Sequence, residues 1–193
     1  HITGVNTNEV RWGTPEHTGG QKSGLRFDGT GQQSFDEGGN FLLGTLTHFN
    51  YPIYDAATGA KLKITLTFSK PAVSPNPDFS YDFVIDETPN SWQCPAWQQS
   101  HTPCDDKITF PSSYGEKSFQ IEDKLYTLKI LGFASSYPGG SPVGQFITEE
   151  EKNNTAYLVG TLSSILVAAP QISLVEKAVN NDDADSTPGP TLY

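Results

Sequence analysis

The chain has 193 residues, of which 35% are hydrophobic, and it carries a formal net charge of −10 at pH 7. That length and apolar content suffice for one domain with a substantial core. The surplus of acidic residues argues against nucleic acid as a partner, because phosphates are bound by Lys and Arg. No apolar run approaches the roughly 18 residues that a membrane-spanning helix needs, so we expect no direct membrane insertion. A first residue His1 is expected of a mature or excised fragment.

Alternating apolar and polar residues dominate the chain and predict β-strands. Residues 62–69 place an apolar side chain at every second position, and residues 79–86 repeat the pattern. Asp82 and Asp86 then fall on the solvent side of the second segment. Only residues 148–154 suggest helix, and they are too short and polar for more than one turn. The predicted strands are residues 10–13, 24–27, 41–49, 62–69, 79–86, 107–110, 117–121, 125–133 and 156–167.

These strands predict an all-β fold: an antiparallel β-sandwich, lectin-like or jelly-roll-like, with about nine or more strands. The sandwich domain is expected to span residues 1–170. Residues 171–193 contain a polar stretch rich in Asn, Asp and Pro, which predicts a linker or the start of a following extender-type repeat. The side chains expected in the core are Trp12, Leu62, Ile64, Leu66, Phe79, Tyr81, Phe83, Leu128 and Ile130.

The stretch from residue 88 to residue 110 holds the chain's two cysteines, Cys94 and Cys104, in a loop rich in Pro, Gln and Ser. Such a composition has little helix or strand propensity of its own. Two free thiols in a polar loop would be exposed and reactive, so a disulfide is the favoured interpretation and two free thiols the alternative. The disulfide indicates an oxidising, extracellular setting.

Oxygen-bearing side chains lie on both sides of this loop. Asp86 and Asn90 precede the cysteines, and Asp105 and Asp106 follow them. A disulfide would draw the two ends of the loop together, and calcium binds several oxygen ligands that converge from loops. The sequence therefore predicts a calcium site formed by these four residues. The alternative is that Asn90 caps a turn and the Asp pair only precedes a strand.

Four residues are candidates for ligand contact. Trp92 and Trp97 lie in the loop, where large rings can form a platform for a sugar or a peptide side chain or can cover a minor core. His48 and Asn50 lie near the end of a predicted strand. The favoured interpretation of His48 is a hydrogen-bonded histidine that fixes the following turn, and the second interpretation is a ligand contact at the rim of the sandwich.

The order of short motifs along the chain resembles the choice-of-anchor K domain of bacterial surface and secreted proteins. The resemblance covers roughly residues 3–166, and it implies a β-sandwich on an exported protein. A related possibility is a likeness to the peptide-binding domains of RTX adhesins, from which no binding residues are carried over. The matching motifs are GVNTNEVRWGTP (4–15), SGLRFDG (23–29), FLLGTLTHFNYPI (41–53), DFVIDETPN (82–90), CDDKITF (104–110), YTLKILGF (126–133) and FITEEEKNNTAYLVGTL (146–162).

Catalysis finds little support in the sequence. No histidine stands in a setting typical of nucleophilic or metal-assisted hydrolysis, and we expect no enzyme. The favoured function is a ligand-binding module of a bacterial cell-surface or secreted adhesin. It would bind a peptide or glycan with the help of calcium, beside neighbouring domains of a larger protein. The alternatives are a structural spacer without a ligand and a carbohydrate-active hydrolase with two facing carboxylates.

Overall fold

The computed structural model describes residues 1–69, 72, 76–90, 94–98, 103–110 and 117–167, and within them the chain forms strands, turns and bends but no helix. No helix in this described part is long and apolar enough to cross a membrane. The strands are β1 (Glu9–Trp12), β2 (Thr14–Pro15), β3 (Ser23–Gly29), β4 (Asn40–Asn50), β5 (Ile53–Tyr54), β6 (Gly59–Thr65), β7 (Asp78–Asp86), β8 (Asp106–Thr109), β9 (Lys117–Ile121), β10 (Lys124–Ala134), β11 (Gln145–Thr148) and β12 (Lys152–Leu166).

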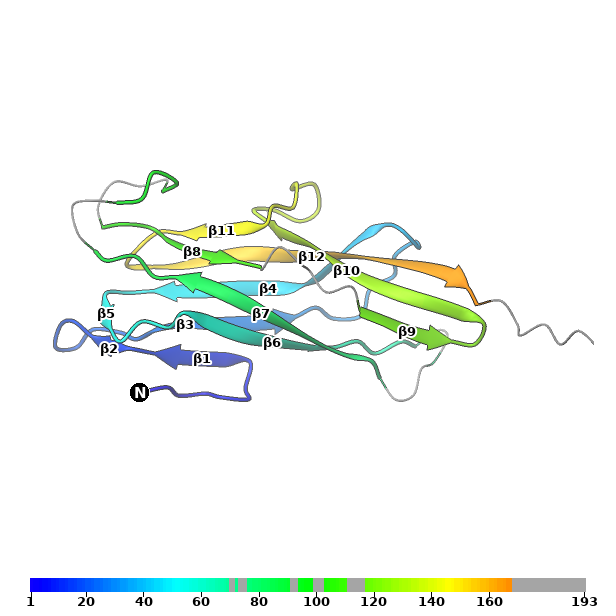
Figure 1. Ribbon diagram of the computed structural model, residues 1–193, viewed down its shortest axis with the longest axis horizontal. Coiled ribbons are helices and arrows are strands. Elements are labelled where there is room, and N and C mark those ends of the chain that lie inside the picture. The colour runs from blue at the N-terminus through cyan, green and yellow to red at the C-terminus, as the bar shows by residue number, and fades with distance from the viewer. Residues whose placement is uncertain (70–71, 73–75, 91–93, 99–102, 111–116, 168–193) are drawn as a thin grey trace, which may run out of the picture.

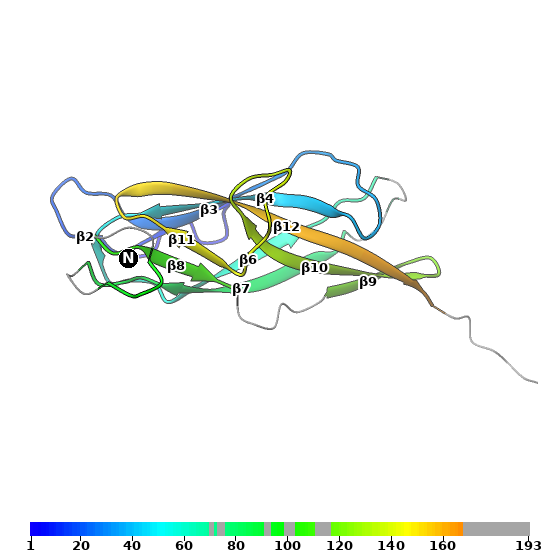
Figure 2. The same ribbon diagram turned by 90° about the horizontal axis from the view of Figure 1, so that it is seen from above.

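Two antiparallel sheets pack face to face. The larger sheet has the order β1-β3-β4-β12-β10-β9, and the smaller has the order β11-β8-β7-β6. Both sets of strands run along the long axis of the molecule (Figure 1), and a view turned by 90° shows the smaller sheet against one side of the larger (Figure 2). Strands β2 and β5 form a short separate ribbon. The predicted antiparallel β-sandwich is confirmed.

The core fills the space between the two sheets with the side chains that alternation predicts. In β7 burial alternates strictly, so that Phe79, Tyr81, Phe83 and Ile85 are buried while the residues between them are exposed. Aromatic rings dominate the middle of this core, and their stacked or edge-on contacts add to the area that they bury. The rings that meet there are those of Phe83, Phe110, Phe133 and Phe146.

Two register shifts bend the larger sheet at its centre. The pairing of β10 with β12 slips between Ile130 and Gly132, and the pairing of β12 with β4 slips at Leu158 and Val159. A bulge places two residues of one strand opposite a single residue of its partner. The extra residues are Leu131 of β10 and Leu43 of β4, and β12 between them pairs without an extra residue.

The predicted strands match the structure closely, except that one strand ends early and three short strands were not predicted. Strand β6 ends at Thr65, whereas the pattern continued to residue 69. The Leu66 amide still bonds to the Pro77 carbonyl, but Pro77 has no N–H with which to continue the ladder. Leu66 is half-buried and packs at the margin of the core. Strands β2, β5 and β11 were not predicted, because they are only two to four residues long.

The expected helical turn at residues 148–154 is wrong. Thr148 ends β11, Lys152 begins β12, and a tight turn joins them, with Glu151 at a φ of 58°. Thr148 pairs with Asp106 of β8 and Lys152 pairs with Asn50 of β4. The acids of this segment therefore lie in a turn that leads from the smaller sheet to the larger, and the pairing of the flanking strands outweighs weak helix propensity. The expected linker at residues 171–193, and with it the domain boundary at residue 170, lies outside the described residues.

Candidate metal centre

At one end of the sandwich, the left end in Figure 1, the inward positions of the strands turn from apolar to polar. Glu87 takes the inward position that follows Ile85 of β7, and Asp106 takes the inward position before Ile108 of β8. Successive inward positions in a strand are two residues apart, so these acids continue the core register instead of leaving it. The same register carries His48 and Asn50 in β4, Thr148 in β11 and Glu150 in the turn that follows.

Hydrogen bonds across this end join the two sheets. His48 of the larger sheet shares a hydrogen bond of 2.8 Å between its Nδ1 and the Thr148 hydroxyl of the smaller sheet. The Asn50 amide donates to the Thr148 carbonyl over 3.1 Å. Trp12 of β1 donates its indole N–H to Glu87 Oε1 over 2.6 Å. The polar end is therefore an ordered part of the interior.

The hydrogen bonds of Thr148 define the tautomer of His48. Its single hydroxyl hydrogen is donated to the backbone carbonyl of Asp106, at 3.4 Å. The Thr148 oxygen then accepts from His48 Nδ1–H, and the lone pair of the neutral ring lies on Nε2. His48 is completely buried, and burial lowers its pKa to about 3, so the ring is neutral. Nε2 has no hydrogen-bond partner.

Three carboxylates lie at this end of the core, and each has a raised pKa. Burial first, and the nearby charge of Glu87 second, raise the pKa of Asp106 to about 8, although hydrogen bonds from Thr88 oppose the shift. Burial raises the pKa of Glu87 to about 7 against the hydrogen bond from Trp12. Burial and the charge of Glu87 raise the pKa of Glu150 to about 7. The ion pairs found among the described residues do not involve these three acids.

His48, Glu87 and Asp106 form a group with the geometry of a metal site. One ligand atom from each lies within 4.8 Å of the others. Two further buried acceptors belong to the same end of the core and have no hydrogen-bond partner, Asn50 Oδ1 and Glu150 Oε1. Unpaired buried acceptors are costly and uncommon in native proteins. A cation bound by His48, Glu87 and Asp106 would give the unpaired His48 Nε2 a partner.

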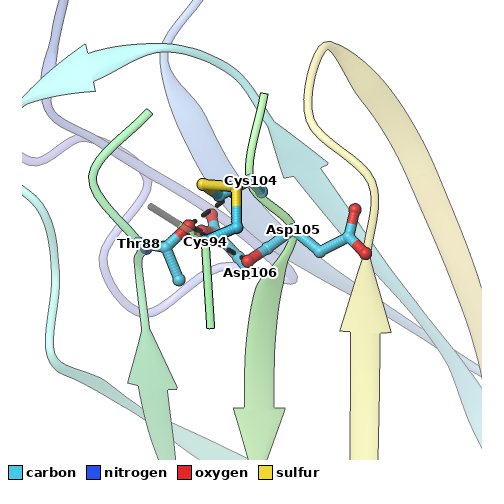
Figure 3. The surroundings of a disulfide bond; sticks show 5 residues. All are labelled: Thr88, Cys94, Cys104, Asp105 and Asp106. Carbon is cyan, nitrogen blue, oxygen red and sulfur yellow. Dashed lines mark hydrogen bonds between the residues drawn. A yellow bond between two sulfur atoms is a disulfide. The ribbon is translucent and has the colours of Figure 1, made fainter. Parts of the chain in front are cut away.

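The disulfide lies close to Thr88 and Asp106, at the edge of this group (Figure 3). Cys94 and Cys104 form the predicted disulfide, with their Cα atoms 5.2 Å apart. Glu87 precedes the loop and Asp106 follows it, and Thr88 connects the two sides through an amide hydrogen bond of 2.7 Å to Asp106 Oδ1 (Figure 3). The base of the loop is thus closed by two connections, the covalent disulfide and the hydrogen bond between Thr88 and Asp106.

The structure brings one of the four predicted calcium ligands, Asp106, into this group. Asp86 faces outward instead and pairs with Lys107 at 3.3 Å, because it occupies the solvent side of β7. Asn90 is exposed, and its side chain bonds to Glu150. Asp105 is fully buried, and its side chain points away from Thr88 (Figure 3).

The predicted ligand-contact residues are also separated. His48 and Asn50 are fully buried between the sheets and do not lie at an exposed rim. Trp97 is half-buried, and Lys107 Nζ lies 4.2 Å from its ring centroid. Trp97, Lys107 and Asp86 together form a group on the outer side of the smaller sheet, which we call the Trp97 group. Trp92 lies outside the described residues.

The predicted set of calcium ligands did not include Glu87, Glu150 or Thr148. The signal that could have found them is the period of two itself. If the alternation of inward and outward side chains is continued past the last apolar residue of each strand, Glu87 faces inward after Ile85. In the same way, Thr148 and Glu150 face inward after Phe146. An acid in the inward register of a core strand is unusual, and several such strands ending together indicate a site.

A scan against protein-family models gave no match to this chain, and a search of curated proteins found no relative. The likeness to the choice-of-anchor K domain therefore stays a prediction from the sequence motifs.

Proposed function

We propose that the chain is a non-enzymatic ligand-binding module of a bacterial cell-surface or secreted adhesin, in which a divalent cation between the sheets fixes the disulfide-closed loop. The observation that carries the proposal is the buried group of His48, Glu87 and Asp106 with its unpaired acceptors. The sequence motifs and the disulfide support an exported protein. A peptide or a glycan is the proposed ligand, and calcium is the cation that the sequence predicts.

A cation at this position would act on the loop through its two ends. Glu87 stands just before the loop and Asp106 just after it, so one ion bound to both carboxylates would close the base of the loop. Ordering a loop before its ligand arrives lowers the entropy lost on binding. Removal of the ion would leave buried carboxylates that repel one another, as their raised pKa values indicate. The loop would then be less well ordered and would bind its ligand more weakly.

The Trp97 group supplies the surface that this loop would present. A half-buried indole beside a lysine and a carboxylate offers an apolar face and both signs of charge within a small area. Aromatic rings of this kind give large contact area at low entropic cost, and they occur in sites for sugars and peptides.

The burial of the polar group favours a binding role over hydrolysis. His48 and Asp106 are at most 1% exposed, so a sugar ring cannot reach them in this conformation. A glycosidase needs its two carboxylates open to the substrate on either side of the scissile bond. A spacer function, the other alternative, would need neither a closed loop base nor the half-buried indole of the Trp97 group.

The test is an array of glycans and peptides probed with the immobilised full chain, once with divalent cations and once with a chelator. We expect binding with cations and its loss with the chelator. Trp97→Ala should weaken the bound signal while the melting temperature stays unchanged. Leu166→Ala is the matched control, since Leu166 is an exposed apolar residue at the opposite end of β12.

Three results would contradict this proposal. If the chain binds no glycan or peptide on the array at a saturating cation concentration, the spacer function would be favoured. Turnover of a polysaccharide would establish the hydrolase. Binding that survives the chelator unchanged would remove the cation from the mechanism.

A further inference from the structure

The polar end of the core contains one nitrogen ligand among its oxygens. His48 is fully buried, and its Nε2 has no hydrogen-bond partner. A ring nitrogen of His48 lies within 4.8 Å of carboxylate oxygens of Glu87 and Asp106. An imidazole in this position changes which cation the group favours.

Calcium is a hard cation that takes six to eight oxygen ligands. Zinc, manganese and other first-row divalent metals accept imidazole nitrogen together with carboxylate oxygen. A site that needed only calcium would gain nothing from a buried histidine whose Nε2 has no hydrogen-bond partner. The donor set therefore fits a transition metal better than it fits the predicted calcium.

The surroundings of His48 are those of a metal-bound histidine. Such a histidine donates its second ring N–H to a fixed acceptor, which sets the tautomer and the orientation of the ring. Here Nδ1–H donates to Thr148 Oγ1, and Thr148 is itself held by the Asp106 carbonyl. Trp12 orients Glu87 and Thr88 orients Asp106 in the same way.

We infer that the site binds a divalent transition metal of the zinc or manganese class through His48 Nε2, Glu87 and Asp106. Asn50 Oδ1 and Glu150 Oε1 at the same end of the core are also buried without a hydrogen-bond partner. This inference rests on the proposed cation-dependent function and names the class of its cation. The metal would join β4 of the larger sheet to β7 and β8 of the smaller.

The experiment is calorimetric titration of the full chain with zinc, manganese and calcium chloride in turn. We expect zinc or manganese to bind more tightly than calcium, with one buried site per chain. His48→Gln should lower zinc affinity by more than about 100-fold, because loss of an outer-shell partner alone costs about 10–100-fold. His17→Gln is the matched control, since His17 is exposed, and it should leave this affinity unchanged.

Nitrogen NMR of the unmodified chain keeps the inference testable if His48→Gln fails to fold. On addition of zinc, the His48 Nε2 resonance should shift while Nδ1 keeps its proton. The inference would be overturned if calcium bound more tightly than zinc, or if bound zinc did not shift the His48 resonance. Either result would contradict only the class of metal and would not contradict the proposed cation-dependent function. Failure of all three metals to bind would overturn the proposed function as well.

Discussion

Asp106 is the residue on which the polar end of the core depends most. It is almost fully buried, it accepts hydrogen bonds from the Thr88 amide and hydroxyl, and its backbone carbonyl accepts from Thr148. In the absence of a cation its charge is opposed by burial and by Glu87, which together raise its pKa to about 8. The same carboxylate is therefore a cost to the metal-free fold and a ligand in the metal-bound one.

Asp106→Asn separates these two effects. Above pH 8, in chelator, we expect the variant to be more stable than the wild type, because burial and the charge of Glu87 oppose the ionised carboxylate. The expected gain is at least about 1 kcal/mol, since a shift of one pKa unit corresponds to roughly that amount. Addition of metal should stabilise the wild type but not the variant. Urea unfolding with and without metal measures both. Asp82→Asn is the control, because Asp82 is exposed and pairs only with Lys61, and a surface pair contributes about 0–1 kcal/mol. A variant less stable than the wild type at high pH would count against this account.

The raised pKa values of Glu87, Asp106 and Glu150 predict how the metal-free protein responds to pH. Each folded-state pKa, at about 7 to 8, lies above its ordinary value near 4. Between these limits the folded state holds more protons than the unfolded state, so the free energy of unfolding falls as pH rises. We expect stability in chelator to be highest near pH 4.5 and to decline until about pH 8. Thermal melts across this range check the sign, and a stability that rises with pH would refute it.

At the scale of single elements, β10 depends on the bulge at Gly132. This glycine has a φ of +131°, and a Cβ added there would lie 2.3 Å from the Val143 carbonyl oxygen. The neighbouring Phe133 exchanges two backbone hydrogen bonds of 2.8 Å with Val143. The bulge thus lets the β10–β11 connection close against the strand, which positions the polar end of β11.

Gly132→Ala should therefore destabilise the fold by about 2 kcal/mol or more, since a forbidden φ and a backbone clash act together. Urea unfolding measures the loss. Gly31→Ala is the control, because a Cβ at Gly31 meets nothing within 4 Å and its φ is ordinary, so we expect no loss of stability there. Equal stability of the two variants would show that the bulge can form without glycine.

At the scale of the whole molecule, the two sheets are held together in two different ways along their length. The middle is apolar and aromatic, around Phe83, Phe110 and Phe133. The loop end is polar and relies on hydrogen bonds that cross between the sheets, such as that of His48 with Thr148. A cation at this end would add a further connection between them.

Joint replacement of Cys94 and Cys104 by serine tests how much the loop contributes to this end. A disulfide that closes a loop of this length contributes about 2–3 kcal/mol in the chain-entropy model, and we expect a loss of that size. Metal affinity should also fall, because the ends that carry Glu87 and Asp106 would no longer be held together. Unfolding and metal titration of the double variant measure the two effects. An unchanged metal affinity would show that the site is organised by the strands alone.

Most of the sheet structure was predictable from the chain. The alternation in β6, β7 and β10 marks which side chains enter the core, because burial of one face of a strand requires a period of two. The short strands β2, β5 and β11 were not predictable, since two to four residues are too few to show a period. The turn at Glu151 was missed because the pairing of β11 with β8 and of β12 with β4, rather than local propensity, decides its conformation.

By itself, then, the sequence determined the all-β sandwich, the identity of its core side chains and the pairing of Cys94 with Cys104, each of which follows from local pattern or close spacing. Only the tertiary structure decided which polar residues share a site. His48 and Thr148 are 100 residues apart, and Trp12 and Glu87 are 75 apart. Contacts of this kind depend on how two sheets are placed face to face, and strand order and register set that placement. The alternation within a single strand shows that Glu87 faces inward, but it does not show which residue it will meet.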